Sequence, residues 1–576
     1  MMGRRPTALH PNPWENGGLR LEGAAKQAME TGRNRLLITG FLFAVGFLMV
    51  GLRLVEVSLF QEGTEPRLAG PPAAATFQME RGDIVDRNGV LLATSLATAS
   101  LYADPARVLD AKDAARRLVQ VLPELSKAEV LAKLQVKRRF VWLRRNLTPR
   151  QQYAVNRLGI PGLYFRREER RVYPHGRLVA HLVGFTGVDN NGLAGIERYF
   201  DDALRGGTTP LTLSLDIRIQ HILHAELSRA MAEYEALGAA GLVLDASTGE
   251  VLAMVSLPDF DPNQPGAAGD EARFNRGTLG VYEMGSTFKI FTAAMALDAG
   301  TATLDNGYDA TEPIRIARFT IRDFKPQRRW LSVPEIFMYS SNIGAAKMAL
   351  DVGTNGQQEF FERLGFLRPA RIELPEVGTP IAPSPWREIN TMTIAFGYGL
   401  AISPLQLANG TAAIVNGGVL HRPTLLKRRP DEPVPGTQVI SPRTSEKMRR
   451  LLRLVVLEGT GKNAAAPGYL VGGKTGTAEK MGAGVYLEKA LLSSFVGAFP
   501  MTDPRYVVLA LLDEPHGNER TFGYATGGWV AAPVVGRVIE RIAPLVGVAP
   551  VDEDSPELRE AFYVNLDARG RNLASF

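Results

Sequence analysis

A serine and a lysine stand three residues apart in Ser286-Thr-Phe-Lys289. The segment STFKIFTAAMALDA, which begins at Ser286, lies between Gly285 and Gly300. We therefore expect a helix with a glycine stop, and its apolar residues predict that the helix is buried. The i, i+3 spacing places Lys289 beside Ser286, and burial lowers a lysine pKa, so the amine can accept the serine proton. A capping serine with a snorkelling lysine is the commoner meaning of such a pair, but the apolar surroundings argue against it.

Two further segments carry related residue types. Ser340-Ser-Asn342 precedes an apolar stretch and predicts a loop-to-helix junction, although alone it would be an ordinary capping sequence. Lys474-Thr-Gly-Thr477 alternates small and hydroxyl residues, which suits a strand that a substrate can approach closely. It lacks the glycine frame of a phosphate-binding loop. The separations, 340 − 286 = 54 and 474 − 340 = 134 residues, place the three segments on different elements that must converge. Together they indicate acyl transfer through a serine ester.

The three segments resemble the Ser-x-x-Lys, Ser-Asp-Asn and Lys-Thr-Gly set of the penicillin-binding proteins, in the same order. Only the variable middle position of the second segment departs from that pattern. The resemblance runs from about Arg81 to about Pro544 and identifies the chain as a class B member, most similar to the division-specific enzymes. Elongation-specific relatives are the alternative. It rests on blocks that include RGDIVDRNG, RVYP, GLAGIE, FGYG and SFVG.

The resemblance implies a role for each polar residue of the set. Ser286 attacks the carbonyl between two terminal D-alanines of a donor stem peptide, and neutral Lys289 takes its proton. Lys474 stays cationic and lowers the pKa of Lys289. Ser340 relays a proton to the departing D-alanine, and Asn342 holds an amide of the donor. An amine of an acceptor stem peptide then attacks the ester, and β-lactams acylate Ser286 as substrate mimics.

The substrate-binding side of the expected site lies on the third segment. Thr475 and Thr477 receive the terminal carboxylate together with Lys474, and Gly476 between them allows a close approach. Backbone N–H groups of Ser286 and Thr477 form the expected oxyanion hole. Glu283 is a further candidate, either as a solvated acid or as a tether for Lys474 in the substrate-free site.

Leu36–Leu52 is an uncharged run (LLITGFLFAVGFLMVGL) at the short end of a membrane span. Arginines and a lysine exceed the acidic residues before it, so the positive-inside rule predicts a cytoplasmic N-terminus with the remaining chain outside. A cleaved signal peptide is the competing interpretation, but no Ala-x-Ala-like site follows. The absence of cysteine excludes disulfides, thiolate metal sites and a lipoprotein anchor.

These signals divide the chain into six parts. We expect a cytoplasmic tail (1–35), an anchor helix of the inner membrane (36–56), a linker (57–76), a non-catalytic pedestal (77–237), a transpeptidase domain (238–546) and a loose polar tail (547–576). The expected fold class is α/β (α+β): a mixed antiparallel sheet with helices on its faces, beside an elongated α+β pedestal. The RREERR run at 166–171 predicts a solvated face.

Three functions compete at this point. A transpeptidase predicts a long-lived penicilloyl adduct, a D,D-carboxypeptidase or β-lactamase predicts rapid turnover, and a β-lactam-binding scaffold predicts that Ser286→Ala supports growth. No deacylating glutamate is found in the context known from class A β-lactamases, which favours the first. Without a glycosyltransferase module, the resemblance implies an FtsW-like glycan polymerase and other divisome membrane proteins as partners. We expect no cofactor, metal or nucleic acid, given a net charge of +6 and no basic stripe.

Overall fold

The computed structural model describes residues 35, 37–53, 81–207, 209–316, 319–482, 485–564 and 566. The chain divides into two units, residues 1–78 and 79–576. In the first unit, residues 37–53 are helical and their large apolar side chains are exposed. None of the helices in the described ranges has the length and apolar content needed to cross a membrane. The predicted tail at 1–34 and linker at 57–76 lie outside the described residues.

A five-stranded sheet forms the centre of the second unit, in the order β16-β17-β18-β6-β7. Every pair in it is antiparallel, with Lys474 opposite Val496 and Leu509 opposite Leu242. The mixed pairing that we expected occurs instead near residue 84, where β1 pairs antiparallel with β2 and parallel with β5. The bounds are β6 Gly238–Asp245, β7 Val251–Leu257, β16 Gly472–Gly482, β17 Val485–Phe499 and β18 Tyr506–Asp513.

Helices bury both faces of this sheet. Alternate residues of β6 point to opposite sides: Leu242 joins one hydrophobic core and Val243 joins the other. The first core includes residues of α10 Lys289–Ala299, α12 Asn342–Arg363, α14 Pro404–Val415 and α15 Pro442–Leu457. The second includes residues of α8 Ile217–Glu233 and α17 Ala532–Ile542. A sheet covered on both faces explains why its strands are apolar runs rather than alternating ones.

Shorter elements complete this region and surround the candidate site. The helices are α9 Asp270–Arg273, α11 Val333–Tyr339, α13 Glu388–Ile394, α16 Gly527–Val530 and α18 Pro556–Ala561. The strands are β8 Tyr282–Glu283, β9 Gly307–Asp309, β10 Ile314–Ile316, β11 Phe319–Ile321, β12 Trp330–Ser332, β13 Ala401–Ile402, β14 Val419–His421 and β15 Gly436–Gln438.

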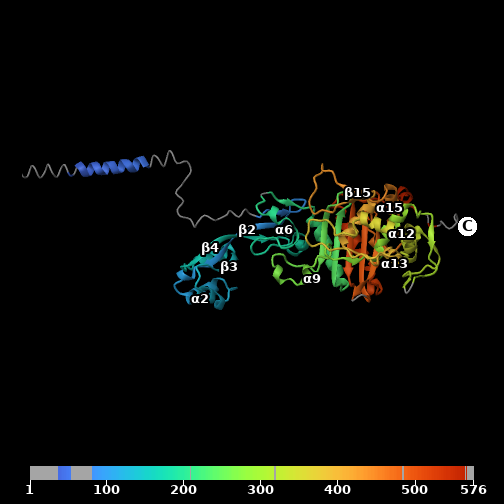
Figure 1. Ribbon diagram of the computed structural model, residues 1–576, viewed down its shortest axis with the longest axis horizontal. Coiled ribbons are helices and arrows are strands. Elements are labelled where there is room, and N and C mark those ends of the chain that lie inside the picture. Colours follow the sequence, from blue (N-terminus) through green and yellow to red (C-terminus); the bar gives the residue numbers. More distant parts are fainter. Residues whose placement is uncertain are drawn as a thin grey trace, which may run out of the picture. The chain divides into compact units, whose positions relative to one another are not determined.

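The preceding part of the second unit is an α+β region with a sheet of its own. Its strands are β1 Ile84–Val85, β2 Leu91–Ala103, β3 Val141–Leu147, β4 Leu163–Val172 and β5 Leu211–Thr212. Its helices are α2 Ala111–Val121, α3 Lys127–Leu134, α4 Pro149–Asn156, α5 Ala180–Val183, α6 Gly195–Tyr199 and α7 Asp201–Leu204. Residues of α2, α3 and α4 share a core with β2 and β3 (Figure 1).

A buried ion cluster holds this region together. Glu197 accepts from Arg81 Nε and from Arg171 Nε, both at 2.6 Å, and Asp201 accepts from Arg81 Nη1 at 2.7 Å. Breaking such a pair leaves an uncompensated buried charge. The 166–171 run is therefore not a uniformly solvated face, because Arg171 at its end is 6% exposed while Arg170 is exposed.

The structure contradicts the prediction of a loose tail after residue 546. Val551 N donates to Gly468 O at 2.9 Å, and Glu553 pairs with Arg453 and also accepts from Gly468 N at 2.6 Å. Phe562, beyond the short helix α18, packs against the main core. Few apolar residues mark this segment in the sequence, so its docking depends on ion pairing with distant residues.

Candidate active site

Ser286 lies in a 3-10 turn, Gly285–Phe288, that leads directly into α10. The α-helix itself begins at Lys289 rather than at Ser286, and it ends at Gly300 in the left-handed conformation that the sequence predicts. Gly285 has a φ of +55°, and a Cβ there would come within 2.5 Å of Thr477 O. Only glycine permits both the conformation and this contact. The turn therefore places Ser286 against strand β16.

Lys289 Nζ is the centre of a polar cluster within an apolar core. It lies 2.8 Å from Ser286 Oγ, 2.9 Å from Ser340 O, 3.1 Å from Ser340 Oγ and 2.7 Å from Asn342 Oδ1. Its side chain is 2% exposed. The structure thus brings together two segments that lie 54 residues apart in the sequence.

The contacts of Lys289 suit a neutral amine. Burial, followed by repulsion from Lys474, holds the pKa of Lys289 well below its usual value. A neutral amine has two N–H donors and one lone pair. Ser340 O and Asn342 Oδ1 can only accept, so they take the two N–H groups, and the lone pair is left for a hydroxyl. The Ser286 hydroxyl, at 2.8 Å, can then donate to Lys289.

Ser340 lies at a corner between two helices. It ends α11 with φ 61° and ψ 45°, and Ser341 is the N-cap of α12, its Oγ accepting from Gly344 N at 3.0 Å. This confirms the predicted junction. A left-handed serine is strained by about 1 kcal/mol or more, which is tolerated because helices on both sides fix the turn. The strain directs Ser340 O and Oγ toward Lys289.

Asp323 supports this corner and was missed in the sequence. Its Oδ1 accepts from Asn342 N at 2.5 Å and Ile343 N at 3.0 Å, and its Oδ2 accepts from Ser341 Oγ at 2.7 Å. A carboxylate at the first turn of α12 satisfies N–H groups that lack partners within the helix. Asp323 lies in a loop without periodic pattern, so no local signal connects it with a helix 19 residues later.

Lys474 projects from β16 on the other side of Ser340. Its Nζ lies 3.0 Å from Ser340 Oγ and 3.3 Å from both Thr475 O and Thr475 Oγ1. Ser340 Oγ therefore stands between two lysine amines. Burial lowers the pKa of Lys474 to about 7. The substrate-free site is thus less positive at neutral pH than the permanent cation that the sequence analysis expected.

The other residues of the third segment are also held in place. Thr475 Oγ1 lies 2.8 Å from Thr460 Oγ1, and Thr477 Oγ1 accepts from Gly527 N at 3.0 Å. A Cβ at Gly476 would lie 2.6 Å from Met284 O, so the glycine permits the strand to approach the Ser286 turn. The prediction of a strand with a closely approached backbone is confirmed.

Glu283 does not contact Lys474, which corrects one of the two interpretations offered for it. Glu283 Oε1 accepts from Gly399 N at 2.6 Å and from the Tyr486 hydroxyl at 3.3 Å. Burial raises the pKa of Glu283. Its side chain is partly buried rather than solvated, and it connects β8 with the loop before β13.

The assembled site can support acyl transfer. It offers a half-buried hydroxyl, an amine that can accept its proton, a second hydroxyl between two amines, and a lysine with threonines that can receive a carboxylate. All eight residues predicted from the three segments lie in this one site or on the strand that borders it.

Comparisons with known proteins agree with this geometry. The description "Penicillin binding protein transpeptidase domain" matches residues 239–540, and "Penicillin-binding Protein dimerisation domain" matches residues 76–210. The "Probable peptidoglycan D,D-transpeptidase FtsI" of Caulobacter vibrioides is 42% identical over 544 residues, which cover 92% of this chain and 91% of that protein.

Further relatives share less of the sequence over a similar length. Peptidoglycan D,D-transpeptidase FtsI of Escherichia coli is 31% identical and covers 90% of this chain and 92% of its own. Stage V sporulation protein D of Bacillus subtilis is 32% identical, covering 90% and 87%. The crystal structure of penicillin-binding protein 3 from Mycobacterium tuberculosis with aztreonam has a TM-score of 0.66 at 25% identity, covering 82% of this chain and 98% of that one.

Proposed function

Because this chain belongs to the class B penicillin-binding proteins, we propose that it cross-links peptidoglycan at the division septum through an ester on Ser286. It is a peptidoglycan D,D-transpeptidase, like the relatives that cover more than nine-tenths of its length. The residue roles, the septal place and the membrane anchor are the parts proposed here.

The contact set of Lys289 carries the proposal. Two acceptors occupy its N–H groups and leave the lone pair for Ser286 Oγ at 2.8 Å. Ser286 therefore attacks the carbonyl of the penultimate D-alanine while Lys289 takes the proton. Backbone N–H groups of Ser286 and Thr477, which the Gly285 contact brings close, stabilise the oxyanion by about 3 kcal/mol each.

Release of D-alanine requires a proton at its nitrogen. Ser340 Oγ, 3.1 Å from Lys289 Nζ and 3.0 Å from Lys474 Nζ, passes that proton from Lys289 to the leaving amine. Lys474, with Thr475 and Thr477, binds the terminal carboxylate, and this anion raises the pKa of Lys474 so that it becomes fully cationic. The amine of the acceptor stem peptide then enters and its proton returns along the same path.

A hydrolase would need a base that activates water against the ester. Among the residues that the structure describes, no aspartate or glutamate oxygen forms a hydrogen bond with Ser286 or Lys289. The ester is therefore expected to persist until an amine arrives, which favours transpeptidation over D,D-carboxypeptidase or β-lactamase activity.

The place of action rests on similarity and on the N-terminal segment. We assign residues 36–56 as an inner-membrane anchor that leaves the catalytic part in the periplasm, supported by the apolar run and its positive flank. An FtsW-like polymerase and other divisome proteins are the proposed partners, and elongation is the alternative role. Septal or lateral recruitment of a fluorescent fusion during depletion of the native protein decides between the two roles.

Labelling with a penicillin tests the chemistry. Intact-mass measurement should show one adduct, peptide mapping should place it on Ser286, and its half-life should exceed that of a β-lactamase adduct by orders of magnitude. An adduct on another serine, or its loss within seconds, contradicts the proposal. Ser341→Ala provides the matched control, because Ser341 lies beside the site without contacting Lys289.

A further inference from the structure

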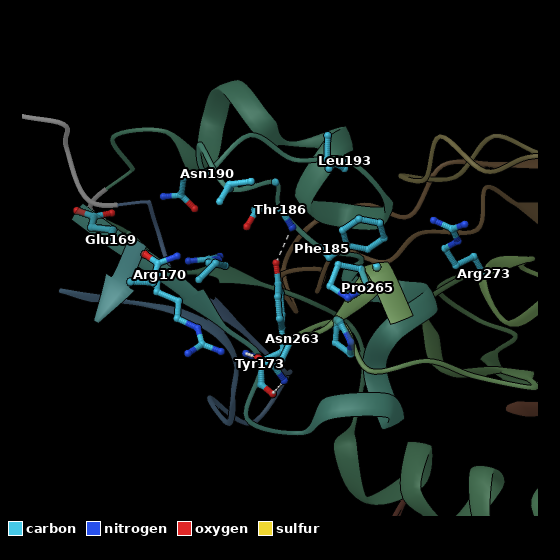
Figure 2. A pocket seen from close by; sticks show the side chains of 16 residues that line it. Glu169, Arg170, Tyr173, Phe185, Thr186, Asn190, Leu193, Asn263, Pro265 and Arg273 are labelled. Carbon is cyan, nitrogen blue, oxygen red and sulfur yellow. Dashed lines mark hydrogen bonds between the residues drawn. The ribbon is translucent and has the colours of Figure 1, made fainter. Parts of the chain in front are cut away.

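A cavity of about 450 Å³ lies where residues 146–193 meet residues 262–273 (Figure 2). This volume is in the range of sites that bind small molecules. None of the residues of the Ser286 site lines it. Its two sides are joined by Asn263, whose Oδ1 accepts from Tyr173 N and whose Nδ2 donates to Tyr173 O, both at 3.0 Å.

Two polar atoms in the wall of this cavity are buried without a partner. Arg171 donates through Nε to Glu197 and through Nη1 to Arg81 O, but its Nη2 has no hydrogen-bond partner among the described residues. Asn190 Oδ1, also in the wall, likewise has none. A buried polar group without a partner is costly and uncommon in a native protein. The cavity therefore presents a cationic donor and a neutral acceptor that a ligand could satisfy together.

The charge of the lining favours an anion. It contains three arginines and one acidic residue, Glu169. Arg171 shares Glu197 with Arg81, whereas the exposed Arg170 forms no ion pair within the described ranges. Figure 2 shows Arg170 and Arg273 at opposite ends of the cavity in this view. Arg273 pairs only with the fully exposed Asp270, a partner that solvent screens strongly.

Apolar side chains form the remainder of the wall. Phe185 and Pro265 line the cavity from its two sides, and Leu193, which is 49% exposed, lies at the rim (Figure 2). An inorganic anion would satisfy the arginines but neither these apolar surfaces nor the Asn190 acceptor. The lining matches a carboxylate with an adjacent N–H donor and a small apolar substituent.

We propose that this cavity is a second binding site, separate from the Ser286 site, for the carboxylate end of a short peptide. Arg171 Nη2 donates to the carboxylate and Asn190 Oδ1 accepts the amide N–H of the last residue. Phe185 and Leu193 pack against its side chain, and Arg170 adds long-range attraction. Such an end is supplied either by a wall stem peptide, with D-residues, or by a protein segment, with L-residues.

Binding is measured by calorimetry on full-length protein that benzylpenicillin has first acylated, so the Ser286 site is blocked. Intact mass verifies acylation, and failure at that step concerns the proposed function alone. The probes are N-acetyl-D-Ala-D-Ala and N-acetyl-L-Ala-L-Ala, with the D-Ala-D-Ala carboxamide as neutral control. We expect a Kd of about 0.1 to 1 mM for one free acid and binding at least tenfold weaker for the carboxamide. The preferred free acid identifies the source.

Two variants locate the binding. Asn190→Gly removes the acceptor and keeps the left-handed backbone (φ 63°), and Arg170→Gln removes an exposed charge. Each should weaken binding at least fivefold, whereas Arg166→Gln, an exposed arginine of the same strand outside the lining, should change it less than twofold. If neither free acid binds saturably, if the carboxamide binds as well, or if folded Arg170→Gln protein retains full affinity, the proposal is wrong.

Discussion

Asp323 is predicted to determine both the stability of the Ser340 corner and the proton affinity of Lys289. Asp323→Ala removes a carboxylate that accepts from Asn342 N, Ile343 N and Ser341 Oγ. Hydrogen bonds to a charged group contribute about 1.5 to 3 kcal/mol each. Because Asp323 is only partly buried, water replaces some of them. We expect the free energy of unfolding to fall by about 2 to 4 kcal/mol.

The same change should slow acylation. Asn342, released at the start of α12, no longer fixes its Oδ1 at 2.7 Å from Lys289 Nζ. Loss of one positioning contact corresponds to a rate reduced about 10- to 100-fold, equivalent to about 1.4 to 2.7 kcal/mol. Asp323→Asn keeps the shape and one acceptor oxygen, so it should fall between the parent and the alanine variant.

The pH dependence separates this role from a purely structural one. The negative charge of Asp323 raises the pKa of Lys289, in opposition to burial and to Lys474. Neutralising Asp323 therefore lowers that pKa further. Since Lys289 must be deprotonated to act as a base, the acidic limb of the acylation profile should move to lower pH in Asp323→Asn. A structural defect alone would reduce the rate equally at every pH.

Stopped-flow acylation by nitrocefin between pH 5 and 9, with denaturant unfolding in parallel, measures both effects. Asp110 supplies the matched control, because its carboxylate accepts from Lys112 N and Asp113 N at the start of α2, within another core. Asp110→Ala should lower stability and leave the acylation profile unchanged. An Asp323→Asn profile that coincides with the parent would refute the electrostatic part of the reasoning.

The remaining predictions concern three other side chains. Lys289→Arg cannot lose its proton, so acylation should fall at least 10²-fold with the fold retained, and a rate within tenfold of the parent would exclude Lys289 as the base. In Ser286→Ala protein, binding of a β-lactam carboxylate at pH 8 should take up about one proton, because the pKa of Lys474 rises from about 7; calorimetry in buffers of different ionisation enthalpy measures this, and no uptake would mean that Lys474 is already charged. Glu553→Gln weakens its ion pair with Arg453 and should lower stability by about 1 to 3 kcal/mol without changing acylation, while an equal loss in Glu557→Gln would argue against a specific docking role.

The sequence predicted the candidate site better than its supports. Ser286, Lys289 and Lys474 are recognisable because a buried helix and a strand of small residues surround them, and both patterns are local. The conformation of Ser340 is not local, since a left-handed serine is stabilised only by the helices on each side. Asp323 gives no signal, because its function depends on a helix that is distant in the sequence.

The same distinction explains the errors. Glu283 has the sequence position of a first-turn acid, but the pairing of β8 with β13 brings it to Gly399 N instead of Lys474. The polar composition after residue 546 is typical of a free tail, whereas the pairing of Glu553 with Arg453, 100 residues earlier, docks it. Both outcomes depend on which distant segments pair, and composition does not encode that choice.

The strand order of the central sheet also has a consequence in time. Strand β18 pairs with β6, yet 506 − 257 = 249 residues separate β18 from the end of the β6–β7 pair. At about 5 to 20 residues per second, roughly 12 to 50 s of synthesis pass before the centre of the sheet can close. Throughout that interval Ser286 and Lys289 exist without the strand that carries Lys474. A nascent chain is therefore chemically silent, and its reactivity begins only when the last strands have emerged and joined the first.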